Sequence, residues 1–157
     1  MNNDRYILVI ADGTKEMEVA LQYACARSKK TNRKIIIATF IEPIDVLTTQ
    51  GVTEIMQNEA REEAEKRIKH ASSIVKESTG ITPVIHIREG EIIQELKSLI
   101  EEEKNINVLV LAASIDEKEK NPGPIINSLL TKELTNFRIP IMIVPGNFSI
   151  EHISHIT

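Results

Sequence analysis

Two loops of this sequence carry residue types that could hold a small anionic ligand. Asp12-Gly13-Thr14 directly follows the apolar run YILVIA of residues 6–11. A longer loop, residues 113–128, begins with Ala-Ser, contains Gly123 and ends with Asn127-Ser128. Glycine and other small residues let backbone N–H groups approach a phosphate closely. The first question is therefore whether these two loops form a phosphate site.

Both loops also have a purely structural interpretation. Asp and Gly favour turns, and the oxygen of Thr14 is suited to capping the helix that follows. Ser128 is equally consistent with a helix surface or with a cap before Leu129. The segment NPGP, residues 121–124, contains two prolines that remove two N–H donors, which favours a rigid turn with Pro124 at the start of a helix.

The periodicity of apolar residues predicts the elements that position these loops. Short apolar runs predict strands at residues 6–11, 34–41, 107–113 and 139–145. Apolar residues at helical spacing predict a helix from Thr14 to about Lys30, a long solvated one over 52–77 and a shorter one after Gly90. In residues 82–89, TPVIHIRE, the side chains of Val84, His86 and Arg88 alternate with those of Ile85 and Ile87. This pattern is typical of a strand with one solvent-exposed face, which places His86 at a sheet edge.

Strands that alternate with helices predict an α/β fold with a doubly wound, Rossmann-like, five-stranded parallel sheet and helices on both faces. The two most apolar strands, the first and the fourth, are best placed at its centre. Ligands of such sheets bind beyond the carboxyl ends of the strands, where the strand order reverses. The loops 12–14 and 113–128 should then face one another across a crevice.

Composition narrows the class of protein. The 157 residues are 41% hydrophobic and 27% charged, which predicts a single globular domain over 1–157, with 147–157 as a flexible tail. The net charge of −4, without a basic patch, argues against nucleic acid as a partner. Cys25 is the only cysteine and fits a buried helix position in a reducing compartment. No apolar run is long enough for a membrane and no leader is visible, so we expect a cytoplasmic protein.

Several segments, taken in order, resemble the universal stress protein family over about residues 4–146. They are VIADGT at 9–14, ALQYACA at 20–26, IIIATFIEP at 35–43, Gly90, VLVLAAS at 108–114 and IPIMIVP at 139–145. The resemblance implies the strand order 3-2-1-4-5 and a homodimer through the last strand, Ile139 to Val144. That order agrees with the edge and central positions inferred from the residues.

In one branch of that family the resemblance implies an ATP site, with the pattern G-x2-G-x9-G-[ST] after the fourth strand. The three glycine positions fall on Ala113, Asp116 and Asn127, and only the hydroxyl residue Ser128 remains. Added carboxylates would repel a triphosphate. By resemblance, Asp12 matches the aspartate that contacts the nucleoside, and Thr39 to Ile41 match the segment beside the adenine. The candidate crevice therefore comprises Asp12, Gly13, Thr14, Thr39, Phe40, Ile41, Ala113, Ser114, Asn127 and Ser128.

We therefore expect a small regulatory protein of the universal stress type, acting in a stress response by dimerisation and partner association without standard ATP binding. This interpretation predicts no cofactor. The alternative is a switch that binds AMP, ADP or ATP through a remodelled loop, with an adenine nucleotide as the possible cofactor. Catalysis is the weakest hypothesis, because no catalytic triad or metal-ligand set is recognisable. The pair His152 and His155 supplies too few ligands for a structural metal.

Overall fold

The computed structural model describes residues 3–43, 50–115 and 121–157. Five strands form one parallel sheet in the order β3-β2-β1-β4-β5. The strands are β1 Tyr6–Ile10, β2 Lys34–Ile41, β3 Val84–Glu89, β4 Ile106–Ala113 and β5 Ile141–Pro145. The predicted doubly wound α/β fold and its strand order are confirmed, with β3 and β5 at the two edges.

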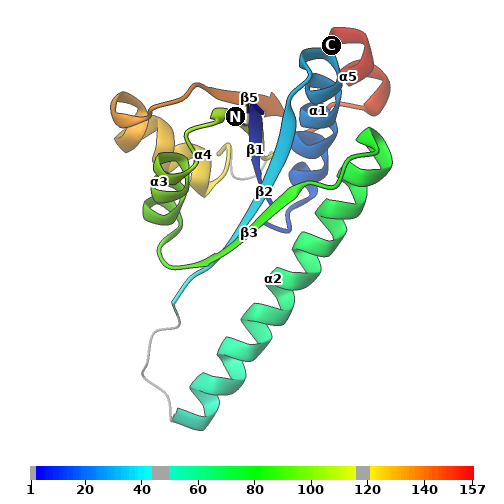
Figure 1. Cartoon of the computed structure of the whole chain (residues 1–157). Helices are drawn as coiled ribbons and strands as arrows, with labels where there is room; N and C mark the ends of the chain where they lie inside the picture. The colour runs from blue at the N-terminus through cyan, green and yellow to red at the C-terminus, as the bar shows by residue number, and fades with distance from the viewer. Residues whose placement is uncertain (1–2, 44–49, 116–120) are drawn as a thin grey trace.

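The helices divide between the two faces of the sheet (Figure 1). They are α1 Lys15–Thr31, α2 Gln50–Thr79, α3 Ile92–Glu102, α4 Pro124–Ser128 and α5 Ile150–Ile156, with a π-helical turn at Leu129–Glu133 and a 3₁₀ turn at Leu134–Asn136 between α4 and β5. Helices α1 and α2 cover one face, whereas α3 and α4 cover the other. Successive residues of β1 show this division, since Ile7 and Val9 pack under α1 while Leu8 and Ile10 face α3.

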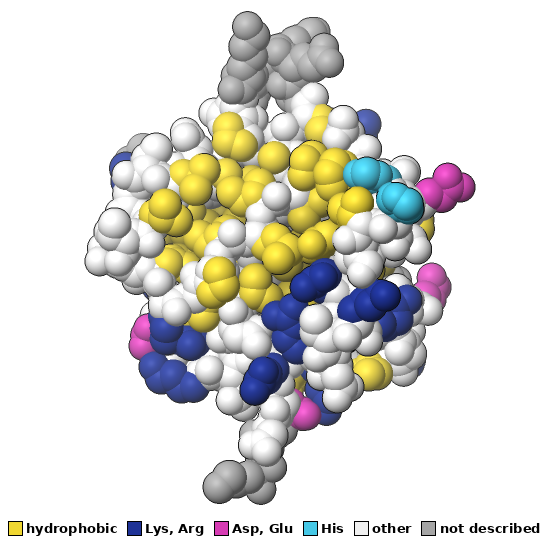
Figure 2. All heavy atoms as spheres, turned by 90° about the horizontal axis from the view of Figure 1, so that it is seen from above, with side chains coloured by type: hydrophobic (Ala, Val, Ile, Leu, Met, Phe, Trp, Pro, Cys, Tyr) yellow, Lys and Arg dark blue, Asp and Glu magenta, His cyan; other side chains and the backbone are white. Residues whose placement is uncertain are grey.

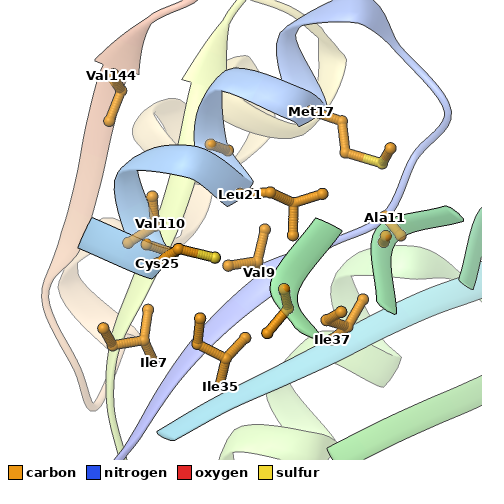
Figure 3. Packing of buried hydrophobic residues seen from close by; sticks show 14 of the residues in the cluster. Ile7, Val9, Ala11, Met17, Leu21, Cys25, Ile35, Ile37, Val110 and Val144 are labelled. Atoms are coloured by element: carbon orange, nitrogen blue, oxygen red, sulfur yellow. The ribbon is translucent and has the colours of Figure 1, made fainter. Parts of the chain in front are cut away.

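The core under α1 is built from aliphatic side chains together with Met17 and Cys25 (Figure 3). Leu21 and Cys25 of α1 are fully buried against Val9 and neighbouring strand residues. Burial raises the pKa of the Cys25 thiol, despite an opposing hydrogen bond from Ser78. The interpretation of Cys25 as a buried core residue is therefore confirmed.

Helix α2 is much longer than the sheet is deep. At 1.5 Å per residue its 30 residues extend about 45 Å, and its N-terminal half projects beyond the body of the molecule (Figure 1). Its apolar stripe is buried only from Ala64 onward, whereas Val52 and Ile55 are exposed. Gly80 ends the helix with a positive φ of 74°, and its N–H donates to the Lys76 carbonyl oxygen.

The C-terminal segment 147–157, expected to be a flexible tail, contains helix α5. Ser149 caps α5 by accepting a hydrogen bond from the His152 N–H (3.1 Å), and Ile153 is buried as α5 packs against α1. The Phe148 and His152 rings also meet edge to face, with their centroids 4.6 Å apart. One buried isoleucine and a serine cap are enough to order this short helix, although its seven residues are mostly polar or exposed.

Candidate functional site

A cavity of about 380 Å³ lies between the carboxyl ends of β1 and β4, and we call it the strand-end cavity. Its position agrees with the crevice expected at the reversal of strand order. The described residues that line it are Ile10, Asp12, Thr14, Glu16, Met17, Ala20, the β4 residues 110–112, Ser114 and the segment 122–126. The loop after β1, the first turns of α1 and the start of α4 thus enclose one space.

The loop after β1 is held by its own side chains. The Thr14 N–H and hydroxyl both donate to Oδ1 of Asp12, at 3.0 and 2.7 Å. Thr14 does stand at the N-cap position of α1, but its side chain does not cap the helix, contrary to expectation. This geometry supports the turn interpretation, and Oδ2 of Asp12 keeps no hydrogen-bond partner within the described residues.

Two backbone amides beside the cavity are paired within the loop after β4. The Ser114 N–H donates to the Pro122 carbonyl oxygen (2.9 Å), and the Gly123 N–H donates to Oδ1 of Asn121 (3.0 Å). Pro122 and Pro124 have no N–H to offer. Pro124 begins α4, as predicted, and a phosphate at this turn would have to compete with these internal bonds.

The charge of the cavity lining is negative. Asp12 is exposed at its mouth and Glu16 is half-buried, and neither forms an ion pair with a described residue. No lysine, arginine or histidine is among the described lining residues. Asp116, assigned to the second glycine position, lies outside the described residues. Within the described lining, phosphate therefore has no cation to pair with.

Thr39, Phe40 and Ile41 do not line this cavity. The buried Thr39 hydroxyl donates a hydrogen bond to the Ala11 carbonyl oxygen (2.7 Å). Its oxygen accepts hydrogen bonds from Nε and Nη2 of Arg67, at 3.3 and 3.2 Å. Phe40 packs in the core under α3, and the Ile41 carbonyl oxygen accepts from the Gly90 N–H (3.0 Å). These groups therefore serve the fold in the structure, and a role beside an adenine stays a prediction.

The other candidates separate into two groups. The structure brings Asp12, Thr14 and Ser114 together around the cavity. Gly13 instead lies beside Arg67 of α2, with a positive φ of 79°. Ala113 pairs with Pro145 of β5, while Asn127 and Ser128 lie further along α4, outside the lining. The first group is thus the part of the predicted crevice that forms one site.

Sequence reasoning missed the contribution of α1 to this site. Met17 and Ala20 were recognisable as one face of a helix, and Glu16 precedes them directly. Because α1 begins at the end of β1, its first turns must flank the same crevice, and this adjacency was the available signal.

A second hollow of about 490 Å³, lined in part by Lys29, Lys30 and Ile153, lies between α1 and α5, away from the strand ends.

Other classes of site receive no support from the described residues. They contain no group of three or more His, Cys, Asp or Glu side chains that could hold a metal ion. No described helix combines the length and hydropathy needed to cross a bilayer. His86 lies on the edge strand β3, with its Nε2 4.0 Å from a Glu103 carboxylate oxygen. Strand β2 separates β3 from β1 and β4, whose ends form the strand-end cavity.

Comparison with known proteins decides the family. The model of the universal stress protein family matches residues 5–145, nearly the whole chain. The chain belongs to the universal stress protein family. A search of curated proteins finds no match to it.

Solved structures agree with this assignment at the level of the fold. UspA from Lactobacillus plantarum superposes with a TM-score of 0.75 at 11% identity, covering 92% of this chain and 99% of that one. A universal stress protein in complex with cAMP gives 0.61 at 18% identity, covering 92% and 98%. One from Archaeoglobus fulgidus in complex with dAMP gives 0.63 at 12% identity, covering 90% and 97%.

Proposed function

We propose that this universal stress protein is a regulatory protein that acts by association, as a homodimer through β5 and with a protein partner, and not by catalytic turnover. The observation that carries the proposal is the apolar character of the β5 edge. The same proposal places the protein in the cytoplasm.

The β5 edge combines two features of a pairing surface. As the last strand in the order β3-β2-β1-β4-β5, it has backbone N–H and C=O groups on its outer side that pair with no other described strand. Hydrophobic side chains gather on the face that contains this end of the sheet (Figure 2). The exposed apolar residues of β5 and the elements beside it are Leu130, Leu134, Ile143 and Ile150.

A second copy of the chain satisfies both features. Pairing of β5 with its symmetry copy would complete the backbone hydrogen bonds, and the same contact would bury the apolar side chains on both subunits. Pro140 precedes the strand and Pro145 is its last residue, and together they limit the pairing to the central residues of β5. The interface is then short along the strand and depends strongly on side chains such as Ile143.

The test is sedimentation of the parent protein and of Ile143→Lys. Ile143 is 37% exposed on β5, so the substitution should not disturb the fold, yet a dimer would bury two lysines. We expect the dimer to weaken at least about 100-fold, or roughly 2.8 kcal/mol. Val84→Lys, at a 40% exposed position on the opposite edge strand, is the matched control. A parent protein that is monomeric at micromolar concentration would remove the dimer from the proposal.

A second candidate function is an adenine-nucleotide switch. It is favoured by the position of the strand-end cavity and by the two similar structures described with cAMP and dAMP. In this chain Oδ2 of Asp12 is a group available for a nucleoside, because both hydrogen bonds from Thr14 end on Oδ1. Calorimetric titration with ATP, ADP, AMP and adenosine tests it, and Asp12→Ala should abolish binding without unfolding the protein.

A further inference from the structure

We propose that Arg5, Arg27 and Arg33 form a binding site for a small tetrahedral oxyanion, namely a phosphate group that is either free or part of a monoester. We call these three residues the arginine cluster. Arg5 directly precedes β1 and Arg33 directly precedes β2, so the cluster lies at the amino ends of the strands, whereas the strand-end cavity lies at their carboxyl ends. The inference therefore goes beyond the dimer through β5 and beyond the nucleotide switch.

The register of β1 and β2 brings two of the arginines side by side. The two strands are parallel, and the Lys34 N–H donates to the Arg5 carbonyl oxygen at 2.8 Å. The residues two positions after Arg5 and Arg33 are Ile7 and Ile35, and both are buried under α1. Because side chains two positions apart in an extended chain share a face, Arg5 and Arg33 are directed to the side of the sheet that α1 covers.

The last turns of α1 add the third guanidinium. Ser28, the residue after Arg27, holds Arg33 in both directions. The Arg33 N–H donates to the Ser28 carbonyl oxygen at 3.1 Å, and the Ser28 hydroxyl donates to the Arg33 carbonyl oxygen. Burial, and then the positive charges of Arg27 and Arg5, lower the pKa of the Arg33 guanidinium. Arg33 is thus close enough to both other arginines for their charges to repel it.

The arginine cluster has no carboxylate partner in the described part of the chain. Arg61 and Arg88 each pair with a glutamate, at 3.2 and 3.5 Å, but no arginine of the cluster forms such an ion pair with a described residue. Asp4 is paired with Lys34 instead, at 2.8 Å. On the face at the start of β1, lysine and arginine side chains gather next to the apolar area and acidic ones appear at the rim (Figure 2). Three neighbouring like charges favour an anion from outside the chain.

Two of the arginines are positioned by the fold but keep unused donors. Arg33 is half-buried, and its Nε donates to the Thr31 hydroxyl oxygen (2.7 Å) and its Nη1 to Oδ1 of Asn107 (2.9 Å), whereas its Nη2 has no partner among the described residues. The Nε of Arg27 is buried and has no hydrogen-bond partner in the described ranges. A buried donor without an acceptor costs about 1–3 kcal/mol. A phosphate group supplies both the missing acceptor oxygens and the opposite charge, and guanidinium groups match its geometry.

The end of α1 does not use these donors. Basic side chains often donate to the last carbonyl groups of a helix. Here the Ser28 carbonyl oxygen accepts from the Asn32 and Arg33 N–H groups, and the Arg27 carbonyl oxygen accepts from the Thr31 hydroxyl at 2.7 Å. Within the described residues, no guanidinium of the cluster donates to these carbonyl groups. Helix capping therefore does not explain why three arginines meet at this place.

NMR titration of the purified full-length chain tests the site. Inorganic phosphate and glycerol 3-phosphate are the probes, chloride at equal ionic strength is the reference, and ¹H–¹⁵N spectra follow the arginine Nε–H groups. We expect saturable binding of phosphate at least about tenfold tighter than that of chloride, with the largest shift at Nε of Arg27. Tighter binding of glycerol 3-phosphate would identify the ligand as a monoester, and tighter binding of inorganic phosphate would identify it as the free ion; either order supports the site.

Variants locate the site. Arg27→Gln should weaken phosphate at least about tenfold, and Arg27→Lys, which keeps the charge but loses the planar donor group, should weaken it less. Arg5 is exposed, so Arg5→Gln should fold like the parent and also bind phosphate more weakly. Arg61→Gln changes the net charge equally at an exposed position of α2 and is the matched control.

A thermal measurement separates a ligand site from a structural role. In phosphate-free buffer Arg27→Gln should be at least as stable as the parent, because it removes repulsion within the cluster. Added phosphate should then raise the Tm of the parent and of Arg61→Gln more than that of Arg27→Gln. The general stabilising effect of phosphate on folded proteins acts on all three alike and cancels in this comparison. A structural arginine would instead lower the Tm by the same amount in both buffers.

The outcomes decide the proposal. Phosphate binding that is weakened in Arg27→Gln and Arg5→Gln and retained in Arg61→Gln supports it. No saturable binding at millimolar concentration, an unchanged affinity in Arg27→Gln, or an equal loss in Arg61→Gln overturns it. Asp12→Ala and Ile143→Lys should bind phosphate like the parent, so failure of the nucleotide switch or of the dimer leaves this test intact.

Discussion

Gly146, directly after β5, provides a sharp test of how closely the ends of β4 and β5 pack. A Cβ at this position would lie 2.2 Å from the Ala113 carbonyl oxygen and 2.7 Å from Cγ of Glu16. Non-bonded heavy atoms are most favourable at about 3.5 Å or more, so the backbones would have to separate by roughly 1 Å. Gly146→Ala should therefore strain the junction that also carries the mouth of the strand-end cavity.

The expected cost follows from the atom that is met. Overpacking typically costs about 1–3 kcal/mol when neighbours can adjust. The nearest neighbour here is a backbone oxygen at the end of a paired strand, so we expect about 3 kcal/mol. For a chain of this length 1 kcal/mol corresponds to about 2–4 °C in Tm, which predicts a fall of roughly 6–12 °C. Thermal and urea unfolding followed by far-UV circular dichroism measure it.

Gly51→Ala is the matched control. Gly51 lies in α2, and a Cβ there would meet no heavy atom of the described chain within 4 Å. Alanine is a better helix former than glycine by up to about 1 kcal/mol, so this variant should be as stable as the parent or slightly more stable. Gly146→Ala with unchanged stability would refute the packing argument, as would an equal loss in Gly51→Ala.

Three further predictions concern single side chains. Thr39→Val removes the hydroxyl bonded to Ala11 and should lower the free energy of unfolding by about 1–2 kcal/mol in urea titration, whereas an unchanged value would mean that this buried bond contributes nothing. Because burial raises the pKa of Cys25, its thiol should react with a disulfide reagent at least about 100-fold more slowly in the native than in the unfolded protein. The contribution of the buried thiol to stability is complete below the unfolded-state pKa and is lost as pH rises through the folded-state pKa. The hydrogen bond from Arg88 lowers the pKa of Glu102, so Arg88→Gln should return that pKa toward its ordinary value in an NMR titration. The stability from this pair is present above the unfolded-state carboxyl pKa and is lost as pH falls through the folded-state value, so parent and variant should converge in acid, and a constant difference would contradict the assignment.

Periodicity was sufficient to predict the architecture. The continuous apolar runs of β1 and β4 require burial on both faces, which places them at the centre of the sheet, and the alternation in β3 indicates an edge. The spacing of motifs from residue 9 to residue 145 identified the family. These features can be predicted from the sequence because each depends on a pattern of residues only a few positions apart, and such patterns recur along the whole chain.

The site and the C-terminus depended on contacts that no local pattern contains. Whether the amides of Ser114 and Gly123 are available is decided by the closure of the loop on Pro122 and Asn121. Thr39 is withdrawn from the crevice by a hydrogen bond to Ala11, 28 positions away in the sequence. Helix α5 is ordered because Ile153 finds a buried place against α1. Residue types show which groups could bind a ligand, but only the packed chain determines which of them the fold has already used.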